Sequence, residues 1–156
     1  MIECLRIDDR LLHGQVITKW ITQYDPDAIV IADDQTVNDE IAKMALKIAK
    51  PSGMKMSIRS VDDAVALLNN EKTKTMKLFV LVKDTNSAKR IVEKVSNIKT
   101  VNIGGMRNNN KDAKVLTGVI KATPQDVENI REMSSQTEID VRTIPSDPKK
   151  DIKELI

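Results

Sequence analysis

The stretch Ile7-Asp8-Asp9-Arg10-Leu11-Leu12-His13-Gly14-Gln15 joins the first apolar run of the chain, Ile2 to Ile7, to a segment with helical spacing. A short apolar run bounded by polar residues is typical of a buried strand. The apolar residues that follow recur at the spacing of one helix face: Val16, Ile17, Trp20 and Ile21. The chain therefore begins with a predicted strand, a polar loop and a predicted helix.

The same strand and helix pattern repeats along the chain. Further apolar runs predict strands at Ala28 to Ala32, Met54 to Ile58, Leu78 to Val82 and Val101 to Ile103. Apolar stripes between them predict helices, at Ile41-Met44-Ala45-Ile48, Val61-Ala64-Val65-Leu68 and Ala88-Ile91-Val92-Val95. This alternation predicts an α/β fold with one open, twisted, mostly parallel sheet and helices on both faces. Four methionines are interpreted as core filler: Met44, Met54, Met56 and Met133.

The last third of the chain continues the pattern. We expect a strand at Gly118 to Lys121, a helix from Pro124 to about Gln136, a strand near Ile139 to Thr143 and a short terminal helix. Capping pairs mark helix starts at Ser60 with Asp63, at Thr123 with Asp126 and at Asp147-Pro148. The chain has 156 residues and no internal repeat or linker, so residues 1–156 are expected to form one domain.

Composition excludes several classes of protein. Lys and Arg number 25 against 23 Asp and Glu, and only three residues are aromatic, so neither a basic footprint nor a stacking platform for nucleic acid is present. The single cysteine, Cys4, cannot form an internal disulfide. Glu3 and Arg6 come too early for a secretory signal, and no apolar run approaches the ~18 residues of a membrane span. We expect a cytoplasmic protein that meets the membrane only peripherally.

The loop after the first strand carries the chemistry. His13 is the only histidine, and an imidazole, with an ordinary pKa of ~6.5, offers a nucleophilic nitrogen at neutral pH. Arg10 can fork onto phosphate oxygens. If the helix begins at His13 or Gly14, the unpaired amides of Gly14, Gln15 and Val16 would also stabilise an anion. The loop therefore predicts a phosphoryl-transfer site, with His13 as nucleophile.

Two carboxylates accompany this histidine, and their roles stay open at this point. Asp8 and Asp9 either orient the His13 ring or cap the loop and pair with Arg10. Other loops are expected at the same edge of the sheet, because the carboxyl ends of parallel strands meet there. Among them, Asp33-Asp34 is interpreted as the cap of the second helix.

The fifth strand is followed by a glycine pair. Gly104-Gly105 is typical of a flexible turn, Met106 beside it suggests an exposed partner contact, and residues 107–111 would suit a docking rim. We therefore expect the residues that contact a partner protein to be Gly104, Gly105, Met106 and Arg107.

Three separated stretches resemble a known family. They are Arg6-Ile7-Asp8-Asp9-Arg10-Leu11-Leu12-His13-Gly14-Gln15-Val16, Val101-Asn102-Ile103-Gly104-Gly105-Met106 and Pro145-Ser146-Asp147-Pro148-Lys149. In this order they make the chain similar to the IIB component of the mannose, fructose and sorbose class of the bacterial sugar phosphotransferase system. The resemblance covers nearly the whole chain. The loop Lys83-Asp84-Thr85-Asn86 departs from relatives with Asn-Pro or Thr-Pro there, so its contribution is open.

The resemblance implies a phosphocarrier with a seven-stranded, mostly parallel sheet whose last strand is antiparallel. His13 would accept a phosphoryl group at Nδ1 from a phosphohistidine on a IIA partner, with Arg10 against the phosphate. It would then pass the group to a sugar held by the membrane IIC and IID partners. This is the activity of a protein-Nπ-phosphohistidine–sugar phosphotransferase. No metal or cofactor is implied, the sugar is not named, and a homodimer is left open.

Three alternatives compete with this hypothesis. A receiver-like signalling domain would use the acidic pairs to bind Mg²⁺, but it needs an acceptor Asp where the sequence has Ser57-Ile58-Arg59-Ser60. A Rossmann-type nucleotide enzyme needs a glycine-rich fingerprint, and the first loop offers only Gly14. A IIB-like regulatory module would bind partners without transferring phosphate. Retention of His13 and Arg10 argues against that module.

Overall fold

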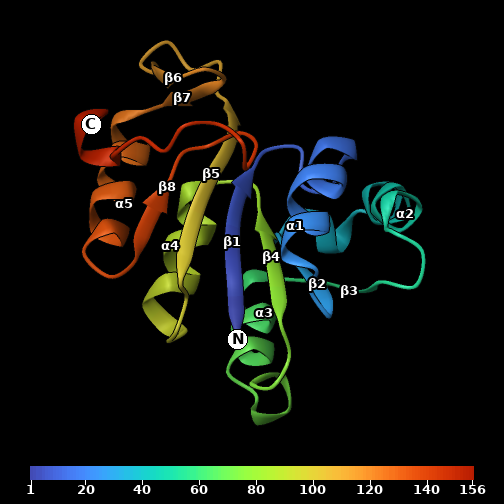
Figure 1. Ribbon diagram of the computed structural model, residues 1–156. Coiled ribbons are helices and arrows are strands. Elements are labelled where there is room, and N and C mark those ends of the chain that lie inside the picture. The colour runs from blue at the N-terminus through green and yellow to red at the C-terminus, as the bar shows by residue number, and fades with distance from the viewer.

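The computed structural model describes residues 1–156 as an eight-stranded sheet with helices on both sides (Figure 1). The strands are β1 (Ile2–Asp8), β2 (Ala28–Ala32), β3 (Lys55–Arg59), β4 (Leu78–Val82), β5 (Thr100–Arg107), β6 (Lys114–Thr117), β7 (Ile120–Ala122) and β8 (Glu138–Asp140). The α-helices are α1 (Thr22–Tyr24), α2 (Glu40–Ala49), α3 (Val61–Leu68), α4 (Thr85–Lys94) and α5 (Pro124–Ser134). A π-helical segment, η1 (Val16–Ile21), leads into α1, and short 3₁₀ turns are η2 (Thr36–Asn38), η3 (Glu71–Thr73) and η4 (Ile152–Glu154).

The sheet has the strand order β3-β2-β4-β1-β5-β7-β6, and β8 pairs with β5 off this path. β1 lies at the centre, parallel to β4 and β5. The predicted fold class, an open and mostly parallel α/β sheet with one antiparallel strand, is confirmed. In detail, the antiparallel strand is the edge strand β6, which pairs with β7. The strand that comes last along the chain, β8, is an eighth strand and runs parallel to β5.

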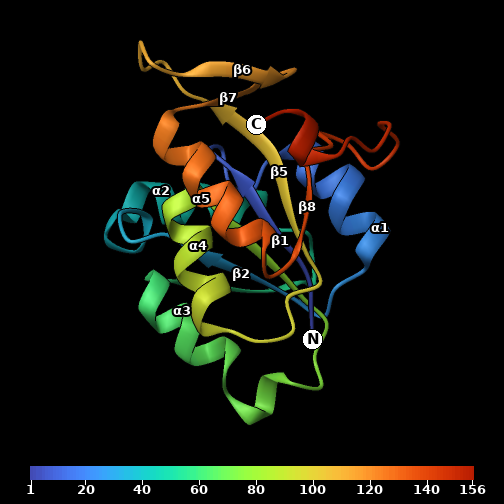
Figure 2. The ribbon, with the colours of Figure 1, turned by 90° about the vertical axis from the view of Figure 1, so that its left-hand side faces the viewer.

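Two apolar cores sandwich the sheet. The larger core, of 26 buried residues, lies under α3, α4 and α5, which stand in front of the strands in Figure 2. The smaller core, of 11 buried residues, lies under η1 and α2 on the other face. Side chains alternate between the two cores along β4, where Val80 faces the first while Phe79 and Leu81 face the second. Because it is buried on both faces, β4 is apolar throughout.

The predicted helix starts are partly confirmed. Thr123 and Asp126 form a reciprocal capping box at α5, and Ser60 accepts a hydrogen bond from the Asp63 amide at α3. The other two expectations are wrong. The cap of α2 is Asp39, while Asp33-Asp34 precede the separate turn η2, where Asp33 accepts from the Thr36 amide. The terminal turn begins after Asp151 and not at Asp147-Pro148.

Helix α2 forms where it was predicted, but its apolar stripe faces outward. Ile41 is 83% exposed, Met44 63% and Ile48 79%. The helix instead packs through its opposite side, where Leu46 is buried and Ala49 lies against the smaller core. The interpretation of Met44 as core filler is therefore wrong, whereas Met133 is fully buried as expected. No helix is long and apolar enough to cross a membrane.

Candidate functional site

The loop that holds His13 leaves the carboxyl end of the central strand. The segment that follows β1 packs on the smaller core, whereas α4, which follows the neighbouring strand β4, packs on the larger one. Loops from these two strands therefore diverge to opposite faces of the sheet. Such a divergence is the place where open α/β sheets bind their ligands.

A tight turn brings His13 back over the end of β1. The Leu11 amide donates to the Asp8 carbonyl at 2.9 Å, and Leu11 adopts a left-handed backbone with a φ of 55°. A branched, non-glycine residue rarely adopts that conformation, and the surrounding structure must hold it there. Leu11 and Leu12 are both buried in the smaller core, which supplies that restraint. The apolar pair in the loop thus anchors the histidine that follows it.

Asp8 is the centre of the site. Its side chain is fully buried, and its Oδ2 atom lies 3.0 Å from Nε2 of His13. The His13 side chain is 18% exposed, and its other ring nitrogen, Nδ1, has no partner within the chain. When Asp8 is ionised it only accepts hydrogen bonds, so Nε2 carries the proton and Nδ1 presents a lone pair. Two roles were left open for Asp8, and this contact corresponds to the first of them, in which Asp8 orients the His13 ring.

Three arginines surround the same carboxylate. Arg6 donates from Nη2 to Oδ2 at 3.0 Å, and the Arg10 amide donates to Oδ1 at 3.0 Å. The Arg10 Nε lies 3.5 Å from Oδ1, and Arg107 Nη1 lies 3.8 Å from the same oxygen. We call these residues, Asp8 with His13, Arg6, Arg10 and Arg107, the Asp8 cluster.

The pKa of Asp8 reflects this environment. Burial alone would raise the pKa, because a carboxylate loses hydration inside the protein. Hydrogen bonds from His13 and from the Arg10 amide, together with the charge of Arg6, more than offset burial and lower the pKa below its ordinary value. Asp8 is therefore an anion at neutral pH, although it is fully buried.

The helix that follows the loop offers unpaired amides. The first hydrogen bond of this helix runs from the Ile17 amide to the His13 carbonyl, at 3.0 Å. The three preceding amides, those of Gly14, Gln15 and Val16, donate to no acceptor in the chain. Gly14 and Gln15 are exposed, so an anion can reach them from solvent. Such a helix start, with its positive dipole end, stabilises anions.

Asp9 has a role different from that of its neighbour. Its carboxylate accepts hydrogen bonds from the Arg107 amide and from Arg107 Nη1, each at 2.6 Å. It makes no hydrogen bond with His13. Asp9 therefore ties the end of β5 to the loop and holds Arg107, whose side chain is 36% exposed, beside Asp8.

Arg6 is a residue of the site that we did not predict from the chemistry of the loop. It is fully buried; besides Asp8 it donates to Oδ1 of Asn102 at 2.6 Å, and Asn102 in turn donates to Asp140 at 3.1 Å. Its guanidinium lies 5.1 Å from the centre of the Trp20 ring. Burial lowers the pKa of Arg6, and the Asp8 carboxylate opposes that shift. The signal in the sequence was a charged residue inside an apolar run, where burial requires a partner.

The glycine pair belongs to this network. Gly104 and Gly105 lie inside β5 and are buried, so the expected flexible turn is wrong. A β-carbon at Gly104 would collide with the Arg6 guanidinium, and one at Gly105 would lie 2.9 Å from the Asp8 carboxylate. Met106 is only 6% exposed and packs in the larger core. Burial therefore contradicts the expectation that these three residues contact a partner; of the predicted set, Arg107 alone reaches the surface.

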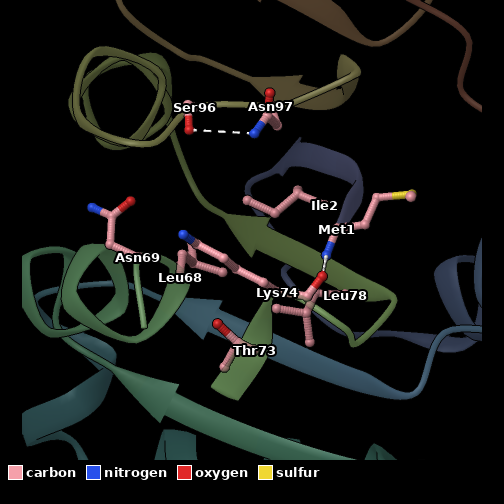
Figure 3. Close-up of a pocket in the computed structure, with 9 residues that line it drawn as sticks. All are labelled: Met1, Ile2, Leu68, Asn69, Thr73, Lys74, Leu78, Ser96 and Asn97. Carbon is pink, nitrogen blue, oxygen red and sulfur yellow. Dashed lines mark hydrogen bonds between the residues drawn. The ribbon is translucent and has the colours of Figure 1, made fainter. Parts of the chain in front are cut away.

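A hollow larger than those beside the His13 loop lies at the opposite edge of the sheet, at the amino ends of the strands. It has a volume of about 350 Å³ and is shown in Figure 3, where Leu78 and Ile2 mark the amino ends of β4 and β1. Lys74 is its only charged side chain, beside the amino terminus of Met1, and its other polar side chains are those of Asn69, Thr73, Ser96 and Asn97. No histidine, cysteine or carboxylate lines it, so its hydroxyls, those of Thr73 and Ser96, have no imidazole or carboxylate in the hollow to activate them. The candidate functional site is the Asp8 cluster.

A partly exposed imidazole, flanked by arginines and unpaired amides at the carboxyl edge of a parallel sheet, defines an α/β protein that handles anionic groups. A family model narrows this class. The chain belongs to the family described as "PTS system sorbose subfamily IIB component", whose model matches residues 2–156. The resemblance to the mannose, fructose and sorbose class is thereby confirmed.

Individual relatives agree with the family. A sorbose-specific EIIB component from Klebsiella pneumoniae is 35% identical over 99% of this chain and 94% of its own length. The crystal structure of the IIBSor domain of the sorbose permease from that organism superposes with a TM-score of 0.91, covering 99% of this chain and 94% of that chain. A mannose-specific EIIAB component from Escherichia coli (strain K12) is 29% identical over 100% of this chain, which spans 48% of that protein.

Family membership settles the broad role. The chain is a IIB component of the sugar phosphotransferase system, and IIB components are phosphotransferases that act as phosphocarriers in sugar uptake. The receiver-like alternative is therefore wrong. The geometry gives the physical reason, because Asp8 and Asp9 direct their oxygens to arginines and to His13 rather than to an open metal position.

Proposed function

We propose that His13 accepts a phosphoryl group on Nδ1 and then transfers it to a sugar. The observation that supports this most is the 3.0 Å contact between Asp8 Oδ2 and His13 Nε2. That contact occupies one ring nitrogen and leaves the lone pair of the other directed away from the carboxylate. A partly exposed imidazole in a fixed tautomer is the form required for nucleophilic attack at neutral pH.

The two transfer steps balance as follows. The Nδ1 lone pair attacks phosphorus of a donor phosphohistidine; a new N–P bond forms, and the donor imidazole leaves with the electron pair of the broken bond. A sugar hydroxyl then attacks the same phosphorus, its proton passes to a base, and Nδ1 recovers its electron pair. The Nε2 proton remains on the ring throughout. No cofactor takes part in either step.

The Asp8 cluster assists both steps electrostatically. Attack through Nδ1 leaves a positive charge on the His13 ring, because Nε2 keeps its proton. The Asp8 anion stabilises that charge from 3.0 Å, in a buried setting where solvent screening is weak. Asp8 is therefore a positioning and charge-stabilising residue, which hydrogen bonds from His13 and the Arg10 amide and the charge of Arg6 together keep ionised.

Groups on the exposed side of the ring would hold the phosphoryl oxygens. Arg10 is 39% exposed, and the loop that carries it continues into the unpaired amides of Gly14, Gln15 and Val16. A guanidinium and a helix start together neutralise charge that spreads over phosphoryl oxygens. Arg107 is held beside Asp8 by Asp9 and supplies a second cation at the rim of the site.

Partners follow from the same proposal. The E. coli relative is named as a mannose-specific EIIAB component, in which a region matching this chain accompanies further sequence in one protein. This supports a IIA component as phosphoryl donor. We propose membrane IIC and IID components as the site where the sugar is presented, and a cytoplasmic position for this chain beside them. A homodimer and the identity of the sugar stay open.

Phosphorylation of the purified chain tests this function against a regulatory module that binds partners without accepting phosphate. The chain is incubated with a phosphorylated IIA component, and we expect an acid-labile, base-stable phosphate on the wild type. The variant His13→Ala should accept none, while Arg10→Ala should accept it about 10²–10³-fold more slowly, as for loss of one charge-stabilising donor. Phosphate that persists on His13→Ala, or a wild type that accepts none, would reject the proposal.

A further inference from the structure

The exposed side of α2 carries an unusual apolar surface. Ile41, Met44, Ala45 and Ile48 are exposed and recur at intervals of three and four residues, so they form one continuous stripe, here called the α2 stripe. In Figure 1 α2 is the outermost helix on its side of the molecule. A contiguous apolar patch of this kind marks an interaction surface.

The α2 stripe borders the phosphorylation site. A hollow of about 260 Å³ separates α2 from the His13 loop. Its lining comes from residues 10–12 on one side and from Ala42, Ala45 and Leu46 on the other. Ala45 belongs to both the hollow and the stripe, and Arg10 belongs to both the hollow and the Asp8 cluster. A protein that brings its own group to His13 therefore meets the flank of α2.

Charge around the stripe indicates the chemistry of that protein. Lys47 is exposed on α2 and has no carboxylate within ion-pair distance. Arg10 is 39% exposed, and Lys83, which also lines the hollow, is 35% exposed and paired with Asp33 at 3.5 Å. The hollow between the stripe and His13 is thus bordered by two basic side chains, Arg10 and Lys83, while the one carboxylate within α2, that of Glu40, is paired with Lys43. It complements an apolar patch bordered by carboxylates and an anionic phosphoryl group.

The size of the stripe favours a transient partner over a second copy of this chain. One face of a ten-residue helix is short of the roughly 800 Å² per partner that a stable interface buries. A carrier must release its donor after every transfer, and small interfaces are typical of such encounters.

We propose that the α2 stripe is the docking contact for the phosphohistidine-bearing donor protein, through an apolar patch with acidic margins on that donor. This proposal rests on the proposed function of His13 and adds to it a surface outside the reacting loop. The stripe lowers the donor concentration needed for transfer and leaves the chemical step unchanged.

The test measures transfer rate against donor concentration. The double variant Ile41→Gln, Ile48→Gln keeps helix-forming residues at exposed positions, so its fold should be retained, which circular dichroism checks. We expect its KM for the phosphorylated IIA component to rise at least tenfold with kcat unchanged. Val115→Gln is the matched control, because Val115 is 62% exposed in β6, away from the hollow, and its KM should not change.

Other outcomes separate the possible occupants. An unchanged KM in the double variant overturns the proposal. Sedimentation then tests whether a second copy of the chain covers the stripe, in which case the wild type is a dimer and the double variant is a monomer. Normal acceptance from IIA with impaired delivery to sugar in membrane vesicles overturns it in favour of a membrane partner. A wild type that accepts no phosphate rejects the function of His13 itself, which is distinguishable because KM is then undefined for every variant.

Discussion

The two edges of the sheet differ in what they contain. The amino edge has the roomier hollow, about 350 Å³, with one charged side chain, Lys74. The carboxyl edge has the Asp8 cluster, where three arginines and the only histidine surround one buried carboxylate. The hollow has no histidine, cysteine or carboxylate, whereas the cluster combines a partly exposed histidine with a buried carboxylate. The chemical nature of the side chains, and not the size of a hollow, therefore identifies the candidate functional site of this molecule.

The shallow site suits a reaction between proteins. A substrate that is itself carried on another protein needs an exposed nucleophile with a prepared electrostatic setting. Burial of Asp8 and Arg6 provides that setting beneath the surface, while His13 and Arg10 remain reachable. The exposed α2 stripe beside the loop fits the same requirement, because recognition takes place outside the reacting groups.

Removing the charge at the centre of the cluster should have the largest effect. In Asp8→Asn the imidazolium loses its counter-charge, so we expect transfer to His13 to slow by about 10²–10³-fold. Single-turnover phosphorylation by saturating phosphorylated IIA component measures this rate, at a temperature where circular dichroism shows the variant folded. A rate equal to that of the wild type would show that Asp8 is structural only.

Filling the space at Gly104 should disrupt the same cluster from below. Gly104→Ala places a methyl group against the Arg6 guanidinium and forces it away from Asp8. Breaking a buried ion pair costs about 3–5 kcal/mol of unfolding free energy. Urea unfolding monitored by Trp20 fluorescence checks the loss. The control Gly14→Ala meets no atom within 4 Å and should change stability far less.

Acid should weaken the carboxyl edge through Asp8. Its pKa is lowered in the folded chain, so the folded state binds fewer protons there than the unfolded state. The stability that Asp8 contributes is present above the unfolded pKa of ~3.9 and is lost as pH falls through the lower folded pKa. Unfolding free energies measured from pH 6 to pH 3 should fall less steeply at the acid end in Asp8→Asn. Equal slopes in both proteins would contradict the assigned direction.

Changes at the amino edge should have the smallest effect. Lys74→Met removes the only charged side chain of the hollow, whose ammonium pairs with Glu71 on the surface. A surface ion pair contributes about 0–1 kcal/mol, and His13 lies at the other edge of the sheet. We expect unchanged transfer kinetics and a small change in urea midpoint. A loss of transfer comparable to that of Asp8→Asn would remove the distinction between the two edges.

Local patterns in the sequence predicted most of the fold. Apolar runs of five or more residues, as in β2 and β4, mark strands buried on both faces, and capping pairs such as Thr123 with Asp126 mark helix starts. The edge strand β6 was missed because it pairs on one side only and its residues are exposed or half-buried, which leaves no apolar alternation. Helix α2 was predicted, but its orientation was not, because an apolar stripe indicates a helix without stating what it contacts.

The sequence indicated the loop residues of the candidate site, whereas the buried residues that support this loop were missed. His13 and Arg10 follow from residue type and position after the first strand. The separate roles of Asp8 and Asp9 could not be assigned, since one turn at Leu11 decides which carboxylate faces the ring. Gly104 was interpreted as a turn because its neighbour Arg6 is 98 positions away in sequence and adjacent only across β1 and β5. Long-range contacts of this kind are not encoded in local patterns.

The nitrogen that carries the phosphoryl group tests the central claim most directly. Nitrogen-15 and phosphorus-31 NMR of the chain, phosphorylated by a IIA component, distinguish the two ring positions of His13. Because Asp8 occupies Nε2 in the folded chain, we expect the phosphoryl group on Nδ1, with the Nε2 proton retained and hydrogen-bonded. Phosphate on Nε2 of His13, or an acyl phosphate on Asp8 or Asp9, would contradict the account.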